Sequence, residues 1–501
     1  MLRALVGALA LTAAATAGAA RLAGATQAAP APGPTRPASV SPSHLLRLQD
    51  DILTLTRSPG VERAVWGIVV QSLDRAERLV EVNPRTLLVP ASAAKLLAVA
   101  NAVDAVGWDF RFATELRTAG TVVRGVLRGD LIVVGSGDPS IGGRGGSDLE
   151  EWITAVQGAG IERIDGRVIG IDDALEEPRP GLTWAWDDLG TSGTLYGALN
   201  FQENRLPVTV WPGLAAGDPA FIVPDPLTIE RPLINLVTTG EVGSRALLWT
   251  EQRPGEEALS IAGNLPLRSG PVQMAVSAGN PTLWFARNLR HHLIEHGLAV
   301  RGAAVDADDL DEPIDMTATG LVYTHQSAPL RELASPILKD SINIYAEAAL
   351  RLGAPVETRT NDKALEALRA RLSGWGIPPD GQQVVDGSGL SRRNVVAAET
   401  LVGVLARFYE PAGTSPWMTA LPVAGTDGTL QNRMRGTAAQ GNLRAKTGSM
   451  SNIRTLAGYV TTADGERLAF AVLVNNFEGT GAVAVQAIDA IAVRLASFSR
   501  E

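Results

Sequence analysis

The alternation of apolar and polar residues predicts paired strands near both ends of the chain. The apolar, β-branched run 64–71 and the run 78–82 flank a short polar turn, which predicts a hairpin. Toward the other end, the runs 454–461 and 467–475 flank Asp464-Gly465, a dipeptide that favours a tight turn between strands. We therefore expect two hairpins that are far apart in the sequence.

Apolar residues at helical spacing predict helices beside these hairpins. After Ser92, apolar residues recur as in a largely buried helix, which places Ser92 at the helix N-terminus and Lys95 one turn along the same face. The same spacing predicts helices over 282–296, 337–352 and 483–495.

The segment 121–274 differs in character, because short strand-like runs alternate there with turn residues. Helical periodicity returns after it. The simplest interpretation is an α/β (α+β) fold in which one domain, formed by 44–120 and 275–501, is interrupted by a β-rich insertion, 121–274.

The first residues are typical of an export signal. Arg3 precedes a short apolar stretch and small residues suited to cleavage, so we expect a signal peptide over 1–25. The proline- and alanine-rich segment 26–43 has little to bury and is interpreted as a flexible tether. No later segment has the uncharged apolar run that a membrane helix needs. We expect an exported protein, periplasmic or extracellular at the cell surface, with no stable membrane span after signal removal.

Charge and cysteine content exclude several classes of protein. The formal net charge is −9 and no basic block occurs, which argues against a nucleic-acid partner. The chain has no cysteine, so disulfides and thiolate zinc sites are excluded.

Lysine is rare in this chain, with four lysines against forty arginines. A lysine amine, unlike a guanidinium, can be neutralised by burial or by a neighbouring cation. Ser92-x-x-Lys95 is therefore a candidate nucleophile and base, because a serine hydroxyl needs a base to remove its proton. The pKa of Lys95 must then fall from about 10.4 to about 7 to 8. Lys446 could supply the like charge if its strand lies beside the Ser92 helix.

Two further residues have chemistry that suits the same site. Ser341 could pass a proton between Lys95 or Lys446 and a leaving amine. Asn343 could hydrogen-bond a substrate amide. With the residues above, the predicted catalytic group is Ser92, Lys95, Ser341, Asn343 and Lys446.

The string Lys446-Thr447-Gly448-Ser449 precedes the second hairpin and fits an adjoining strand. Its hydroxyl groups could receive a substrate carboxylate, so Thr447, Gly448 and Ser449 are predicted to bind substrate. The backbone N–H groups of Ser92 and Ser449 are candidates for an oxyanion hole.

Three strings in this order resemble the motifs of penicillin-binding proteins and serine β-lactamases: Ser92-x-x-Lys95, Ser341-x-Asn343 and Lys446-Thr447-Gly448. Longer strings narrow the resemblance to the class C low-molecular-mass penicillin-binding proteins: Pro90-Ala91-Ser92-Ala93-Ala94-Lys95, Gly129-Asp130-Leu131 with Gly137-Asp138-Pro139, Asp386-Gly387-Ser388-Gly389-Leu390-Ser391 and Gly425-Thr426-Asp427-Gly428-Thr429-Leu430. The similarity runs from about Leu45 to Leu495.

This resemblance implies a D-Ala-D-Ala carboxypeptidase/endopeptidase of peptidoglycan. The implied fold is a penicillin-binding/β-lactamase-like transpeptidase domain with a large insertion. The implied partners are peptidoglycan stem peptides and β-lactams, both of which would acylate Ser92. Neither a metal nor an organic cofactor is implied.

Three other functions remain open at this stage. A serine β-lactamase would share the acylation residues but would turn penicillin over, and no dedicated deacylation base is evident. A zinc peptidase could use His292 and His296 of the string His-Leu-Ile-Glu-His, although both fall at the edge of a buried helical stripe. A non-catalytic wall-binding protein would keep the fold without the reaction.

The remaining signals have a simpler interpretation. Lys339 and Lys363 are predicted as helix-start or surface charges. The string 386–391 is either a tight turn that needs two glycines or, in addition, a border of the site. Trp184 and Trp186 are expected to pack within the insertion.

Overall fold

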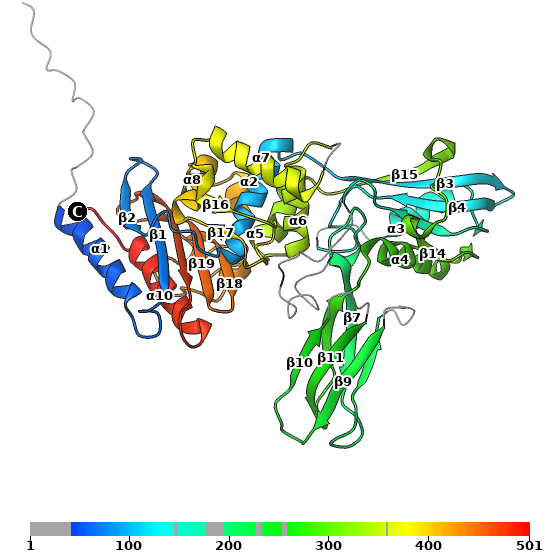
Figure 1. Cartoon of the computed structure of the whole chain (residues 1–501), viewed down its shortest axis with the longest axis horizontal. Coiled ribbons are helices and arrows are strands. Elements are labelled where there is room, and N and C mark those ends of the chain that lie inside the picture. The colour runs from blue at the N-terminus through cyan, green and yellow to red at the C-terminus, as the bar shows by residue number, and fades with distance from the viewer. Residues whose placement is uncertain are drawn as a thin grey trace, which may run out of the picture. The chain divides into compact units, whose positions relative to one another are not determined.

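In the computed structural model, the two predicted hairpins join in one antiparallel sheet with the order β18-β19-β20-β1-β2. The first hairpin and the second are confirmed by the registers of β1 with β2 and of β19 with β20. Strands β1 and β20 pair along their whole length and so connect segments about 400 residues apart (Figure 1). The strands are β1 (Val65–Ser72), β2 (Arg78–Val82), β18 (Arg444–Met450), β19 (Ile453–Thr461) and β20 (Arg467–Asn475).

The structure describes residues 42–144, 149–176, 184, 195–225, 232–252, 258–356 and 359–501. The predicted signal peptide, 1–25, and nearly all of the predicted tether, 26–43, lie outside these residues. Within the described part of the chain, no helix combines the length and apolar character that crossing a membrane requires.

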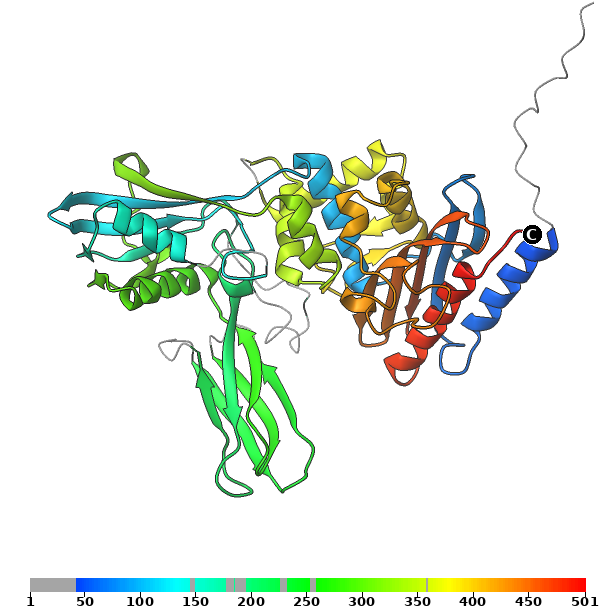
Figure 2. The same cartoon turned by 180° about the vertical axis from the view of Figure 1, so that it is seen from behind.

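Helices cover both faces of the sheet. On one face, α1 (Pro42–Thr56) and the predicted C-terminal helix α10 (Gly481–Ala496) lie side by side, as Figure 2 shows. On the other face lie α2 (Lys95–Val106) and α8 (Ala398–Phe408). Successive side chains of a strand point to opposite faces of its sheet. Because helices cover both faces here, β20 is apolar and buried along nearly its whole length.

The single helix predicted over 337–352 is wrong, because the chain breaks there into α5 (Leu330–Leu338) and α6 (Asn343–Leu352). Between them, Ser341 adopts a left-handed backbone with φ of 65° and Ile342 is extended. Both conformations are incompatible with a continuous helix. After this break, the Ser341 hydroxyl contacts Lys446 and the Asn343 side chain contacts Lys95. Two further helices complete this part: α7 (Asn361–Gly374) packs on α2 and α6, and α9 (Pro416–Thr419) packs on α5.

The inserted part of the chain is built on a seven-stranded mixed sheet, in which β13-β5-β4-β3-β15 form one path and β6 and β14 extend from β4. Two helices pack on it through a core that includes Trp152 and Phe285. One of them, α4 (Pro281–Glu295), is the helix predicted over 282–296. The elements are β3 (Ala113–Val123), β4 (Val126–Val134), β5 (Arg163–Ile164), β6 (Val168–Ile171), β13 (Ala299–Val300), β14 (Ala304–Asp306), β15 (Thr319–Gln326), α3 (Glu150–Gly158) and α4.

Two three-stranded sheets complete the inserted part, with the orders β10-β11-β9 and β12-β7-β8. Their strands are β7 (Arg205–Trp211), β8 (Phe221–Pro224), β9 (Leu233–Gly240), β10 (Leu247–Glu251), β11 (Leu259–Pro266) and β12 (Val272–Ser277). The predicted limits, 121 and 274, cut through the seven-stranded sheet, because β3 pairs with β15 along its length. We therefore propose 113–326 as the extent of the insertion.

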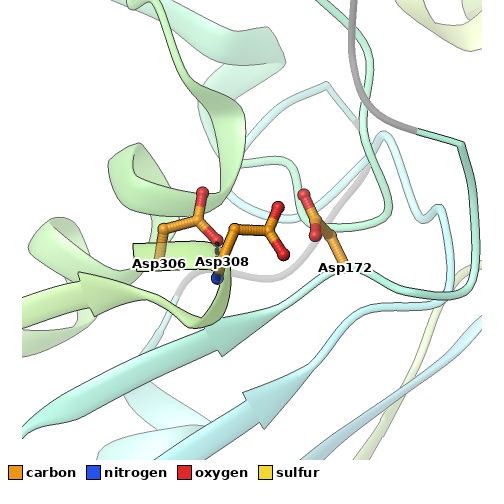
Figure 3. Close-up of side chains that lie close together, drawn as sticks. All are labelled: Asp172, Asp306 and Asp308. Atoms are coloured by element: carbon orange, nitrogen blue, oxygen red, sulfur yellow. Dashed lines mark hydrogen bonds between the residues drawn. The ribbon is translucent and has the colours of Figure 1, made fainter. Parts of the chain in front are cut away.

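Three carboxyl groups gather at one end of β6 and β14, where Asp172, Asp306 and Asp308 lie close together (Figure 3). Burial raises the pKa of Asp172 to about 6, the hydrogen bond from the Thr282 hydroxyl acts against this, and the charge of Asp306 adds to it. The raised pKa means that the folded state holds the proton of Asp172 more tightly than the unfolded state. The stability that this gives is present below the unfolded pKa and is lost as the pH rises through about 6.

Replacing Asp172 with asparagine is therefore expected to stabilise the protein at neutral pH. The gain should be on the order of 1 kcal/mol at pH 7.5 and smaller at pH 5, because the unfavourable charge is then partly protonated. Urea unfolding at both pH values measures it. The neighbouring, exposed Asp173→Asn is the control and should change stability much less. A gain that is equal at both pH values, or a loss, would contradict the assignment.

Candidate active site

Ser92 lies in a tight helical turn rather than in the α-helix itself. The predicted helix start is resolved into a 3₁₀ turn, Ala91–Ala94, that runs directly into α2. Strand β18 passes very close to this turn: a Cβ atom at Gly448 would lie 2.5 Å from the Pro90 carbonyl oxygen. Only glycine permits that approach. It sets the Ser92 turn against the strand that carries Lys446.

Lys95 is fully buried and its amine has three oxygen partners. Its Nζ lies 2.9 Å from Ser92 Oγ, 2.8 Å from Asn343 Oδ1 and 2.6 Å from the Ser388 carbonyl oxygen. The partners come from the 3₁₀ turn, from the start of α6 and from the loop 386–391. The structure thus brings together two of the predicted motifs and the string 386–391, which borders the site.

Lys446 lies in β18, as predicted, and is also fully buried. Its Nζ donates to Ser341 Oγ at 2.9 Å and to the Thr447 carbonyl at 2.9 Å. The hydroxyl of Thr447 donates to Thr429 Oγ1 at 2.8 Å. Gly448 is buried and Ser449 is exposed on the outer strand of the sheet. All eight predicted site residues therefore belong to three adjoining segments.

Burial dominates the electrostatics of the two lysines. Burial lowers the pKa of Lys95 to about 7, while the charges of Asp386 and Glu347 act in the opposite direction. Burial lowers the pKa of Lys446 well below its ordinary value, and the charge of Lys95 lowers it further. Burial is therefore the main cause of the low pKa of Lys95, and the carboxylates oppose it. The prediction that Lys446 supplies a charge that depresses Lys95 stays a prediction.

The loop 386–391 connects two short strands, β16 (Gln382–Gln383) and β17 (Val395–Val396). Its glycines do more than make a turn, because a Cβ at Gly389 would lie 2.0 Å from the Ala91 carbonyl oxygen. This contact fixes the loop against the Ser92 turn. The loop was predicted as a turn or as a border of the site, and it is both.

The other two lysines, Lys339 and Lys363, have different surroundings. Lys363 is an exposed surface charge, as predicted, and pairs with Glu366 in its own helix. Lys339 is more than a surface charge, because its Nζ lies 2.5 Å from Asp427 Oδ2. This ion pair ties the turn before Ser341 to the string 425–430, which sequence reasoning had connected only by resemblance.

The histidines offer little support for a zinc site. His292 Nδ1 and His296 Nδ1 each lie 2.8 Å from a backbone carbonyl of their own helix, which is a structural role. Among the described residues, only the three aspartates of Figure 3 place three metal-ligand atoms within 4.8 Å of one another. The zinc-peptidase alternative therefore has no geometric basis in this part of the chain.

Two buried acids lie beside Lys95, Glu347 and Asp386. Asp386 opens the string 386–391 that the sequence singled out, whereas Glu347 was not predicted. Glu347 stands one helical turn after Asn343, and that spacing on a predicted helix was the available signal. Trp184, expected to pack within the insertion, instead donates from Nε1 to Asp386 at 2.9 Å. Trp186 lies outside the described residues.

The sequence of this chain is similar to those of known carboxypeptidases. The sequence matches the D-Ala-D-Ala carboxypeptidase 3 (S13) family over residues 48–498. It is 33% identical over 478 residues to a D-alanyl-D-alanine carboxypeptidase of Actinomadura sp. (strain R39), covering 92% of this chain and 87% of that protein. It is 24% identical to the D-alanyl-D-alanine carboxypeptidase DacB of Haemophilus influenzae, covering 82% of this chain and 85% of that protein.

The fold is similar to that of penicillin binding protein 4 (dacB) from Haemophilus influenzae. Its crystal structure superposes with a TM-score of 0.77 at 25% identity, covering 89% of this chain and 99% of that one. A second structure of that protein, complexed with a novel β-lactam, superposes with a TM-score of 0.73 at 24% identity over the same shares of the two chains. The predicted penicillin-binding/β-lactamase-like fold is confirmed.

Proposed function

This chain belongs to the D-Ala-D-Ala carboxypeptidase 3 (S13) family, and on that premise we propose that it cleaves D-Ala-D-Ala peptides of peptidoglycan through an acyl-enzyme on Ser92. The observation that carries the proposal is the contact between Ser92 Oγ and the buried amine of Lys95 at 2.9 Å. A pKa of about 7 leaves roughly half of the Lys95 amines neutral at neutral pH, which suits a general base.

The three partners of Lys95 support the direction of proton transfer. A neutral amine has two N–H groups and one lone pair. Asn343 Oδ1 and the Ser388 carbonyl can only accept hydrogen bonds, so they take the two N–H groups. The lone pair then faces the Ser92 hydroxyl, the one partner that can donate.

The reaction would proceed in two balanced steps. Ser92 Oγ attacks the carbonyl between the two D-alanines while its proton passes to Lys95. The amine of the terminal D-alanine takes up the proton that Ser92 gave to Lys95, passed on by way of Ser341, which contacts Lys446, and leaves. Water then attacks the ester and gives one proton to Lys95, which passes it to Ser92 Oγ as the C–O bond breaks, so that the hydroxyl and the neutral amine are restored and the shortened peptide is released.

Strand β18 is proposed to hold the substrate beside Ser92. Thr447, Gly448 and Ser449 would bind the terminal carboxylate, and Asn343 the substrate amide. The N–H groups of Ser92 and Ser449 would stabilise the oxyanion, where each donor is worth about 3 kcal/mol. β-Lactams would acylate the same serine, as the β-lactam complex of the Haemophilus protein suggests for a similar fold. Endopeptidase action on cross-linked peptides and export to the periplasm or cell surface belong to the same proposal.

Release of D-alanine from a stem peptide that ends in D-Ala-D-Ala tests the function directly. We expect release that is blocked by prior incubation with benzylpenicillin, and no release from the same peptide ending in L-Ala-L-Ala. Mass spectrometry of the products measures both. A cross-linked dimer peptide in parallel reports the endopeptidase activity. An enzyme that releases no D-alanine yet hydrolyses penicillin rapidly would instead be a β-lactamase.

A further inference from the structure

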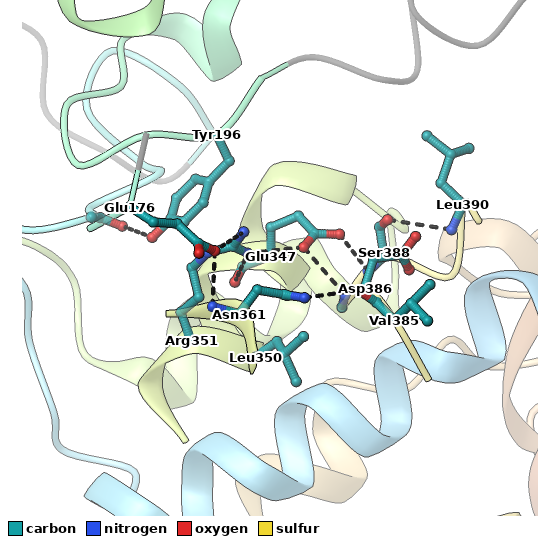
Figure 4. A network of polar contacts seen from close by, with 12 residues as sticks. Glu176, Tyr196, Glu347, Leu350, Arg351, Asn361, Val385, Asp386, Ser388 and Leu390 are labelled. Carbon is teal, nitrogen blue, oxygen red and sulfur yellow. Dashed lines mark hydrogen bonds and ion pairs between the residues drawn. The ribbon is translucent and has the colours of Figure 1, made fainter. Parts of the chain in front are cut away.

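Two buried carboxyl groups lie beside the proposed base, and the reaction described above does not use them. Glu347 is 3% exposed and Asp386 is 6% exposed. Glu347 comes from α6, one turn beyond Asn343, and Asp386 opens the loop 386–391. Figure 4 shows both around Ser388. Burying a carboxyl group costs free energy unless hydrogen bonds and charges compensate it, so the contacts of this pair are informative.

Glu347 fastens the loop to α6. Its Oε1 accepts from the Ser388 N–H at 2.9 Å, and its Oε2 accepts from the Gly387 N–H at 3.2 Å and from Arg351 at 3.0 Å. Glu347 thereby holds Ser388 through its N–H group. The Ser388 carbonyl shares a peptide plane with the Gly389 N–H, which donates to Asp386 Oδ1 at 2.8 Å, so the two acids together fix where the carbonyl points. That carbonyl is the acceptor 2.6 Å from Lys95 Nζ.

Asp386 holds the two ends of the loop together by hydrogen bonds within it. Its Oδ1 accepts from the Gly389 N–H and from Asn394, both at 2.8 Å, and its Oδ2 accepts from the Ser391 N–H at 2.8 Å. Trp184 adds a fourth donor. The two acids thus hold both ends of the short segment that carries the Ser388 carbonyl.

We propose that Glu347 and Asp386 are positioning residues that hold the Ser388 carbonyl against Lys95 and, through their charge, set the pH range in which Lys95 acts as a base. The inference rests on the proposed acylation of Ser92. The hydrogen bonds of the two acids go to the loop, to Arg351, to Asn394 and to Trp184, not to the Ser92 hydroxyl. Each acts through Lys95.

The charged groups that face Lys95 come from three segments. Lys446 lies on β18, Glu347 with its partner Arg351 lies on α6, and Asp386 lies on the loop. The charge of Asp386 has the larger effect on Lys95 and that of Glu347 the smaller, while burial and the charge of Glu347 raise the pKa of Asp386. Negative charge near Lys95 favours its charged form and raises its pKa. Removing that charge lowers the pKa, so neutral Lys95 persists to lower pH.

The test is the pH dependence of the second-order rate of acylation by a fluorescent penicillin. In wild type the rate should fall as the pH drops through about 7, the pKa of Lys95, and level off above it. The falling part is called the acidic limb here and the level part the plateau. In Glu347→Gln, we expect this limb to move to lower pH by about one unit or more, together with a lower plateau. Asp386→Asn should move it in the same direction, and it serves as the test if Glu347→Gln does not fold.

Two controls separate charge from loop geometry. Glu347→Asp keeps the charge, so its limb should stay near that of wild type while its plateau falls. Asn394→Ala loosens the same loop without removing a charge, because Asn394 also accepts from the Val385 N–H at 2.7 Å. Because Asn394 also donates to Asp386 and favours its charged form, the limb of this variant should move much less than that of Glu347→Gln while its plateau falls.

The outcomes distinguish this inference from the proposed function. If wild type takes no label, the acylation of Ser92 and this inference both fail. If wild type is labelled but the limb of Glu347→Gln coincides with that of wild type, only this inference is overturned. The same holds if Asn394→Ala moves the limb as far as Glu347→Gln does.

Discussion

Replacing Ser92 with alanine is expected to abolish covalent labelling by a fluorescent penicillin, at concentrations that label wild type completely. In the proposed reaction the acyl bond forms on Ser92 Oγ, and the substitution removes that atom while keeping the backbone of the 3₁₀ turn. Gel fluorescence and intact-protein mass measure the adduct. D-alanine release from the stem peptide should disappear in parallel.

A matched serine separates loss of the nucleophile from loss of a hydroxyl group in general. Ser136 lies in a loop of the inserted part, where its Oγ is 3.2 Å from Thr114 Oγ1. Ser136→Ala should label as wild type does. Persistent labelling of Ser92→Ala would identify another nucleophile and overturn the proposed mechanism.

Replacing Lys95 with arginine is expected to lower the rate of acylation by about 10³-fold. Arginine keeps a positive charge and much of the length, but it does not release its proton at any accessible pH. If Lys95 only attracted an anionic substrate, arginine would serve nearly as well. The second-order rate of penicillin labelling, measured over a range of pH, checks the prediction, and raising the pH should not restore the rate.

The matched control for this substitution is another of the four lysines. Lys363 is exposed and pairs with Glu366, so Lys363→Arg should retain the wild-type rate. A Lys95→Arg enzyme that acylates within about tenfold of wild type would show that Lys95 is not the base. Circular dichroism confirms that both variants are folded before their rates are compared.

Local patterns in the sequence predicted the elements well, because hairpins and amphipathic helices are encoded by neighbouring residues. Both hairpins and the helices α2, α4 and α10 lie where the periodicity indicates. The exception is the break between α5 and α6. Apolar spacing continues across Ser341 as if the helix did, since periodicity does not report a single residue with a left-handed backbone.

The extent of the insertion was also predicted only in part from the sequence. A change in composition marked its strands, but the sheet that defines its extent pairs β3 with β15, about 200 residues further along the chain. Composition cannot reveal such a partner. The predicted limits therefore fell inside β3 and β12 and left β13, β14 and β15 of that sheet outside the predicted insertion.

The sequence alone determined which residues are the candidates for the chemistry: the rarity of lysine and three short motifs singled out Ser92, Lys95, Ser341, Asn343 and Lys446. Only the tertiary structure decided how these groups are charged. The pKa of a buried amine depends on what covers it and on which charges face it, and these come from α6, β18 and the loop 386–391, which are distant in sequence. For that reason the sequence identified the two lysines as a pair, while the contact of Glu347 and Asp386 with the loop beside Lys95 is visible only in the fold.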